Sequence, residues 1–180
     1  GKFTSLSFFK ALKPSPSFRR GAFFVRRESL SRRSLHFLKS FTTKNEKGIP
    51  MNDKYFETVF LTCESFEEFP ESFAIVTACN PMDKVLTQDE NEERNRQLLD
   101  ILNSRGQYVA NIIGSSRDLE HQEPSLIVRA SRAESLELGI RFEQRAIFWV
   151  SKDLLEIMEC SSGKRFPVGS FRKRIRKGKS

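Results

Sequence analysis

Two side chains near the middle of the chain are of the types that exchange protons. His121 and Glu123 are separated by a single residue, and an imidazole beside a carboxylate is a common general acid/base pair. The only other histidine, His36, lies in the basic amino-terminal segment. The pair alone does not define a site, because His121 lies in a hydrophilic stretch where a solvated side chain is equally expected.

A second group of candidate residues carries side-chain amides that a helix would turn inward. Asn91 and Asn95 share one stripe with Leu98 and Leu102, because residues three or four apart lie on the same helix face. The two leucines must face the core, so the two amides point inward as well. A buried amide without a partner costs about 1–3 kcal/mol, so both must bond another protein group or a ligand.

Two hypotheses follow from these residues. In the functional one, they line a small polar pocket for an anionic or nucleotide-like ligand, which the amide dipoles at the helix start would favour. The residues expected to contact that ligand are Thr77, Asn80, Asn91, Asn95, Ser125 and Gln144, with His121 and Glu123 as the catalytic pair if the protein is an enzyme. In the structural one, the same side chains bond one another and hold loops in place, as buried polar groups commonly do.

Hydropathy patterning predicts the elements that would position these residues. Apolar runs rich in aromatic and β-branched residues predict strands at 55–62, 73–78, 108–113, 125–130, 146–150 and 154–158. One helix is predicted to end at about residue 105 and another at about 143. Each begins with a capping box, formed by Thr87 with Glu90 and by Ser131 with Glu134.

The central part of this succession predicts the fold class. The order strand, helix, strand, strand, helix, strand indicates an α+β fold of the ferredoxin-like, split βαβ type. We expect an antiparallel sheet with both helices on one face, extended by extra strands. The second helix is expected to carry Ala133, Leu136 and Ile140 on one apolar face. In this topology the end of the first core strand, the start of the first helix, the loop 114–125 and Gln144 meet at one edge.

Charge divides the chain into three parts. Residues 1–50 carry 12 Lys/Arg and 2 acids, residues 51–163 carry 11 and 21, and residues 164–180 carry 8 and none. The part that can build a core, expected to be a single domain, is acidic, so nucleic acid could be contacted only through the termini. We expect 1–50 to be disordered or absent from the native protein, with a transit peptide, or a basic arm that binds phosphates or an anionic membrane face, as alternatives. We expect 164–180 to be a disordered basic tail.

The cysteines indicate neither a metal site nor a disulfide framework. Cys63, Cys79 and Cys160 are odd in number and lack metal-ligand spacing, so we expect small buried hydrophobic side chains, no metal and no cofactor. No apolar run approaches the ~20 residues of a membrane span, and no signal-peptide hydrophobic region is present, so a cytoplasmic location is expected. No pattern sets the oligomeric state.

Four stretches resemble, in their order and spacing, a bacterial family known as domain of unknown function 3293. They are Phe73 to Pro81 (FAIVTACNP), the helix from Asn91 to Leu98, Glu123-Pro124-Ser125, and Leu138 to Trp149. The resemblance covers roughly residues 70–160 and implies a bacterial, cytoplasmic setting. It marks the amides and the Glu123 carboxylate as characteristic family residues, without an activity to carry over. An aromatic residue is common in that family where Cys79 stands, which argues against Cys79 as a nucleophile.

The sequence therefore predicts a binding module for a small anionic or nucleotide-like molecule. An enzyme that uses His121 and Glu123 for proton transfer is the first alternative. A nucleic-acid-associated protein acting through its basic ends is the second.

Overall fold

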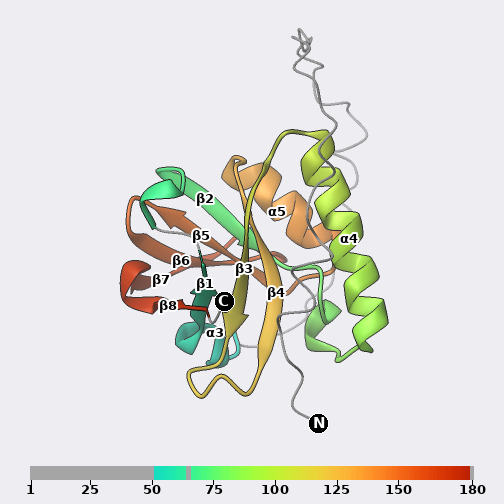
Figure 1. Ribbon diagram of the computed structural model, residues 1–180, viewed down its shortest axis with the longest axis horizontal. Helices are drawn as coiled ribbons and strands as arrows, with labels where there is room; N and C mark the ends of the chain where they lie inside the picture. Colours follow the sequence, from blue (N-terminus) through green and yellow to red (C-terminus); the bar gives the residue numbers. More distant parts are fainter. Residues whose placement is uncertain (1–50, 64–65, 179–180) are drawn as a thin grey trace, which may run out of the picture. The chain divides into compact units, whose positions relative to one another are not determined.

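A single eight-stranded sheet forms the centre of the described part of the protein (Figure 1). The computed structural model describes residues 51–63 and 66–178. The strands are β1 (Val59–Thr62), β2 (Ser72–Val76), β3 (Tyr108–Ser115), β4 (Gln122–Val128), β5 (Ala146–Ser151), β6 (Leu154–Glu159), β7 (Arg165–Ser170) and β8 (Ile175–Lys177). The helices are α3 (Lys54–Glu57), α4 (Gln88–Ser104) and α5 (Arg132–Arg141), with 3-10 turns η1 (Phe66–Glu68), η2 (Pro81–Asp83) and η3 (Arg172–Arg174).

The ferredoxin-like fold predicted from the sequence is wrong for this molecule. The predicted succession of elements is present, and β5, β2, β4 and β3 are neighbours in the sheet order β7-β6-β5-β2-β4-β3-β1-β8. The sheet, however, continues on both sides of these strands, is mixed because β8 runs parallel to β1, and curls into a half-barrel.

Aromatic packing accounts for the curl. Phe60 of β1 contacts Phe148 of β5, with ring centroids 5.1 Å apart, although three other strands separate β1 from β5 in the sheet. Phe171, which follows β7, packs on Phe60 at 5.3 Å and on Phe73 of β2 at 5.4 Å. These rings fill the concave face of the sheet. The sequence pattern placed Phe60 in one long strand and Phe171 in a tail, so it did not predict that these rings pack together and curl the sheet.

The other face of the sheet is covered by α4 and α5, which pack on the same side as predicted. The main buried side chains of this layer are Ala74, Val76, Leu98, Leu102, Leu126, Leu138, Phe142, Ile147 and Met158. Of the apolar face predicted for α5, Leu136 packs on this core, but Ala133 and Ile140 are exposed and the buried positions are Ser135, Leu138 and Gly139. The pattern misled because the position closest to the sheet is a glycine rather than a large apolar residue.

Local signals at the helix ends are confirmed. Thr87 and Ser131 cap α4 and α5, and both capping boxes are complete. The chain leaves α4 through Gly106, whose φ of +64° lies in the left-handed region that favours glycine. The strand predicted at 55–62, in contrast, begins as the short helix α3, and only Val59–Thr62 is extended.

The carboxyl-terminal segment is part of the sheet rather than the disordered tail predicted for 164–180. Between its basic residues it carries Val168, Phe171 and Ile175, which pack on the concave core. Burial of these side chains compensates for ordering a charged segment. The prediction for residues 1–50 lies outside the described residues. In the part of the chain that is described, no helix is long and apolar enough to cross a membrane.

Replacement of Gly139 by alanine is predicted to destabilise the protein. A Cβ atom there would lie 2.6 Å from Cys160 Sγ and 2.8 Å from Ile147 Cγ2. The overpacking should lower the free energy of unfolding by about 1–3 kcal/mol in urea titrations, despite the helix propensity of alanine. Glu137→Ala, on the exposed side of the same helix, should change it by less than about 0.5 kcal/mol. Stability of Gly139→Ala equal to that of the parent would contradict this packing.

Candidate functional site

The loop that follows β2 is held in an unusual backbone conformation. Asn80, Met82 and Asp83 have φ values of +46°, +50° and +62°, in the left-handed region that residues other than glycine seldom adopt. Such a run persists only where surrounding contacts hold it. Here those contacts come from side chains on α4 and on the segment between α5 and β5.

Asn95 on α4 forms hydrogen bonds with backbone groups at the start of this loop. Its side chain is buried, its Oδ1 accepts a hydrogen bond from Ala78 N at 3.0 Å, and its Nδ2 donates to Pro124 O at 3.4 Å. Thr77 Oγ1 donates to the same Pro124 carbonyl at 2.8 Å and accepts from Cys79 N at 3.0 Å. The first loop residues are thereby tied to α4 and to β4.

Two further side chains bind the loop's carbonyl groups. Gln144 Nε2 donates to Cys79 O at 2.9 Å and to Phe142 O at 3.1 Å. Arg94 Nε donates to Ala78 O at 2.7 Å, and its Nη2 donates to Phe142 O at 2.7 Å. Arg94 was missed by the sequence analysis, although it lies three residues after Asn91 on the same helix face.

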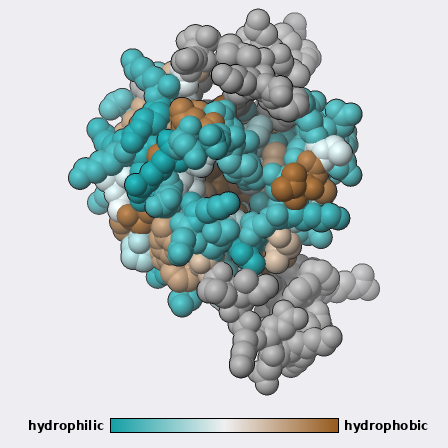
Figure 2. Space-filling model, turned by 90° about the horizontal axis from the view of Figure 1, so that it is seen from below, coloured by the Kyte–Doolittle hydropathy of each residue, from teal (hydrophilic) through white to brown (hydrophobic). Residues whose placement is uncertain are grey.

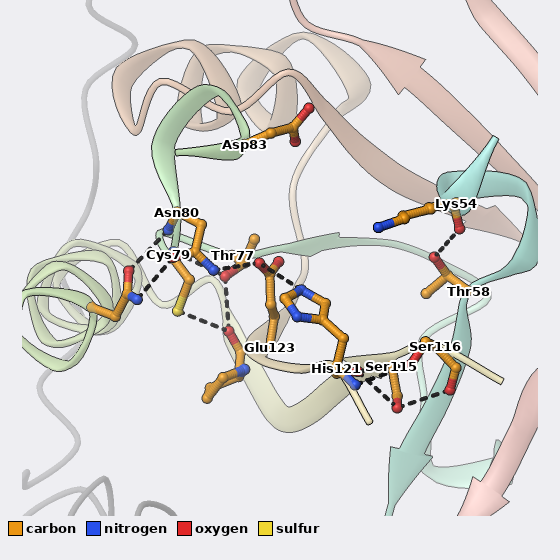
Figure 3. A network of polar contacts seen from close by, with 12 residues as sticks. Lys54, Thr58, Thr77, Cys79, Asn80, Asp83, Ser115, Ser116, His121 and Glu123 are labelled. Atoms are coloured by element: carbon orange, nitrogen blue, oxygen red, sulfur yellow. Dashed lines mark hydrogen bonds and ion pairs between the residues drawn. The ribbon is translucent and has the colours of Figure 1, made fainter. Parts of the chain in front are cut away.

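A chain of polar contacts leads from α4 through Asn80 to β4. Asn80 N donates to Asn91 Oδ1 at 2.9 Å, and Asn91 Nδ2 donates back to Asn80 Oδ1 at 3.0 Å. The remaining amide group of Asn80, Nδ2, donates to Glu123 Oε1 at 2.6 Å, as Figure 3 shows. The left-handed backbone of Asn80 directs its side chain toward Glu123 while its N–H still faces α4.

Glu123 is in turn in contact with His121. His121 Nε2 lies 3.3 Å from Glu123 Oε1, the same oxygen that Asn80 contacts. The His121 side chain is 66% exposed and that of Glu123 only 27%. The hydrogen bond from Glu123 raises the pKa of His121 above its ordinary value. Glu123 Oε2 accepts no hydrogen bond from any residue in the described ranges.

A second polar group borders this pair. Tyr55 OH donates to Asp83 Oδ1 at 3.0 Å, and Arg145 Nη1 lies 2.9 Å from Asp83 Oδ2. Burial, followed by the charges of Asp83 and Glu123, raises the pKa of Tyr55, so its phenol is protonated. In Figure 3 the Lys54 ammonium points toward His121 and Glu123, and its charge opposes the rise in the pKa of His121.

No sequence pattern predicts this second polar group. Tyr55 and Lys54 belong to α3, which was predicted as a strand, and Asp83 follows the Asn80-Pro81 turn without a helix or strand to place it. Arg145 lies next to the predicted Gln144, but its ion pair depends on the position of the η2 turn.

The buried cysteine beside the loop is not a nucleophile in this arrangement. Burial raises the pKa of the Cys79 thiol to about 11, despite the opposing hydrogen bond from Thr77. Cys160, far along the chain, has its pKa raised by burial to about 12. Both therefore remain thiols at neutral pH, whereas nucleophilic attack needs a thiolate. Cys63 is exposed, and none of the three forms a disulfide.

The structure brings the predicted site residues together, and most of their hydrogen bonds are made within the protein. Thr77, Asn80, Asn91, Asn95 and Gln144 bond the β2–α4 loop or one another. Ser125 Oγ donates to the carbonyl of Glu123 at 3.1 Å. The amides thus act as the structural hypothesis expected, and ligand binding by these residues stays a prediction. Glu123 and His121 are the predicted residues with capacity to bind something else.

A family model described as Protein of unknown function (DUF3293) matches residues 76–147 of the chain. The resemblance predicted from the sequence is confirmed. The matched range includes all the predicted site residues but neither α3 nor the strands after β5. No curated protein and no solved structure matched the chain.

Replacement of Asn95 by alanine is predicted to destabilise the loop and the protein. The change leaves the buried Ala78 N–H without its acceptor, which should lower the free energy of unfolding by about 1–3 kcal/mol in urea titrations. Asn103→Ala, on the exposed side of α4, is the matched control and should change it by less than about 0.5 kcal/mol. Equal effects of the two substitutions would contradict a supporting role for Asn95.

The His121–Glu123 contact is predicted to make stability depend on pH. Because the folded state raises the pKa of His121, the contribution is fully present below the unfolded value of about 6.5 and is lost as pH rises through the folded value. The exposed imidazole limits it to about 0.2–1 kcal/mol. An NMR titration should give a pKa for His121 above the ordinary value in the parent and near it in Glu123→Gln. The same raised pKa in both proteins would show that Glu123 is not the cause.

Proposed function

We propose that Asn80, Glu123 and His121 form the polar centre of a binding site for a small molecule that carries a cationic or hydrogen-bond-donating group. The observation that carries this proposal is that the largely buried Glu123 carboxylate has one oxygen, Oε1, in contact with Asn80 and His121 and a second oxygen, Oε2, that accepts no hydrogen bond from the described residues. A carboxylate oxygen in this position is suited to receive a donor from a ligand.

The charges around Glu123 indicate the rest of the ligand. Lys54 and His121 supply positive charge close to the carboxylate, so a negatively charged group of the same ligand would also be accommodated. A purely anionic or nucleotide-like molecule has less support, because the amide groups expected to receive it are bonded within the protein and Thr87 caps the start of α4. The class that fits both charges is a small zwitterion, such as an amino acid.

A second candidate function, acid/base catalysis, is favoured by the direct contact between His121 and Glu123. A carboxylate that accepts a hydrogen bond from one imidazole nitrogen orients the ring and leaves the other nitrogen for proton transfer. The hydrogen bond with Glu123 raises the pKa of His121, which favours the protonated, proton-donating form of the imidazole. Since Cys79 is a protonated thiol, the chemistry proposed is proton transfer rather than covalent catalysis.

A thermal-shift screen of the full chain against small zwitterions, amino acids first, tests the binding proposal. A ligand present at a hundredfold excess over its Kd should stabilise the protein by about 2.7 kcal/mol. Glu123→Gln should abolish that stabilisation. Glu120→Gln, which removes an equal charge from an exposed position in the same hairpin, should retain it. Stabilisation that persists in Glu123→Gln, or a screen in which only anions bind, would contradict the proposal.

Substitution of the His121 imidazole distinguishes acid/base catalysis from simple binding. His121→Gln keeps a polar side chain but removes the imidazole, so the ligand-induced thermal shift should be reduced yet still measurable at higher ligand concentration, while any conversion of the bound molecule should be lost. Mass spectrometry of the ligand after incubation with the parent and the variant measures this. An unchanged ligand after incubation with the parent would rule out acid/base catalysis on that molecule.

A further inference from the structure

Cations gather along one edge of the sheet, away from the β2–α4 loop. The β8 edge is defined here by Arg117 from the β3–β4 connection and by Lys173, Arg174, Arg176 and Lys177 from η3 and β8. Within the described part of the sheet, β8 has a neighbour, β1, on one side only. On its second side, β8 pairs with no strand among the described residues.

The charges of the β8 edge are not neutralised by neighbouring acids. None of its five side chains makes an ion pair with a residue in the described ranges. Arg172, between this edge and β7, lies 3.6 Å from Glu67, but both of these side chains are exposed and the pair is screened by solvent. The edge therefore keeps its positive field, although residues 51–163 carry 21 acids against 11 Lys/Arg.

The cations are held close together by the fold. Arg174 Nη1 donates to Thr58 O at 2.9 Å, which fixes that guanidinium over the end of α3. Burial lowers the pKa of Arg174 and the nearby charge of Arg117 lowers it further, whereas Glu57 acts in the opposite direction. The positive charge of Arg117 therefore acts on Arg174 from a distant part of the chain, and an anionic partner would relieve this repulsion.

The chemistry of the edge favours phosphate groups of a nucleic acid over a lipid surface. Three of the five cations are arginines, whose planar guanidinium binds phosphate through paired hydrogen bonds and stacks on bases. A membrane contact would bury large exposed apolar side chains, and none of these lies on β7, η3 or β8 among the described residues. Near the edge only Leu119, in the β3–β4 connection with Arg117, is of this kind; the others are Met82, Val85, Ile140 and Leu154. Figure 2 shows apolar side chains only in separate patches on a mostly hydrophilic face.

We propose that the β8 edge binds the phosphate backbone of single-stranded nucleic acid without reading its sequence. Counterion release would supply the affinity, so binding should weaken steeply with salt. Arg172, which lies over the Phe66 ring at 4.1 Å, offers a rigid flat surface beside the edge for an unpaired base. The competing explanation is that lysine and arginine on an open strand only prevent pairing with other strands.

Fluorescence anisotropy of the full chain with a labelled oligouridylate of about 12 nucleotides tests this proposal. The double variant Lys173→Gln/Lys177→Gln should weaken binding about tenfold at about 50 mM salt and reduce the slope of log Kd against log salt by about 1.4, or 0.7 for each cation removed. Lys173→Arg/Lys177→Arg should bind like the parent. Both lysines are exposed, so the thermal unfolding midpoint should be unchanged.

A charge-matched control separates this edge from general electrostatic attraction. Residues 1–50 carry a further 12 Lys/Arg, so variants of equal net charge are compared rather than absolute affinities. Arg105→Gln/Arg141→Gln removes two exposed cations from the ends of α4 and α5 and should weaken binding much less. Equal losses in the two double variants would overturn the proposal. The proposal would also be overturned if binding to vesicles of phosphatidylserine and phosphatidylcholine required Lys173 and Lys177 while binding to the oligonucleotide did not.

Discussion

The loop between β2 and α4 depends on side-chain amides that replace the hydrogen bonds of regular structure. Asn95 accepts from Ala78 N, Asn91 accepts from Asn80 N, and Gln144 donates to Cys79 O. Buried backbone groups must be paired, and a loop in a left-handed conformation cannot pair them with a neighbouring strand. The amides therefore make the conformation possible, and it is this conformation that directs Asn80 toward Glu123. The proposed site thus follows from how the buried start of this loop pairs its backbone groups.

The curl of the sheet is a second constraint, and it determines what surrounds that carboxylate. Packing of Phe60 on Phe148 closes the concave face, and Tyr55 on the preceding helix lies over the same Phe148 ring at 6.1 Å. Tyr55 is thereby brought to Asp83, and Lys54 to the vicinity of His121. Apolar packing on the concave face and polar contacts at the loop consequently act together at one rim of the sheet. The carboxyl-terminal strands, which complete the concave face through Phe171, carry the separate basic edge.

The sequence could predict features that depend on local spacing. Capping boxes follow from residues three apart, and the inward direction of Asn91 and Asn95 follows from their spacing to Leu98 and Leu102. The convergence of Asn80, Glu123 and Gln144 followed from the order of the elements, even though the fold class assigned to that order was wrong. The curl was not predictable, because it depends on contacts between Phe60, Phe148 and Phe171, which lie far apart in the chain. The sequence analysis did not predict the group of Tyr55, Asp83 and Arg145 for the same reason, since only tertiary packing makes these residues neighbours.

The central claim is that side-chain amides, rather than strand pairing, hold the β2–α4 loop. Amide hydrogen exchange of the full chain, followed by NMR, measures it directly at the backbone N–H groups of Ala78 and Asn80. The account predicts that both exchange slowly, with Ala78 protected to an extent similar to Val76 of β2, and that Asn91→Ala accelerates exchange at Asn80 while Val76 stays protected. Exchange at Ala78 and Asn80 at the rate of an unstructured peptide would contradict it.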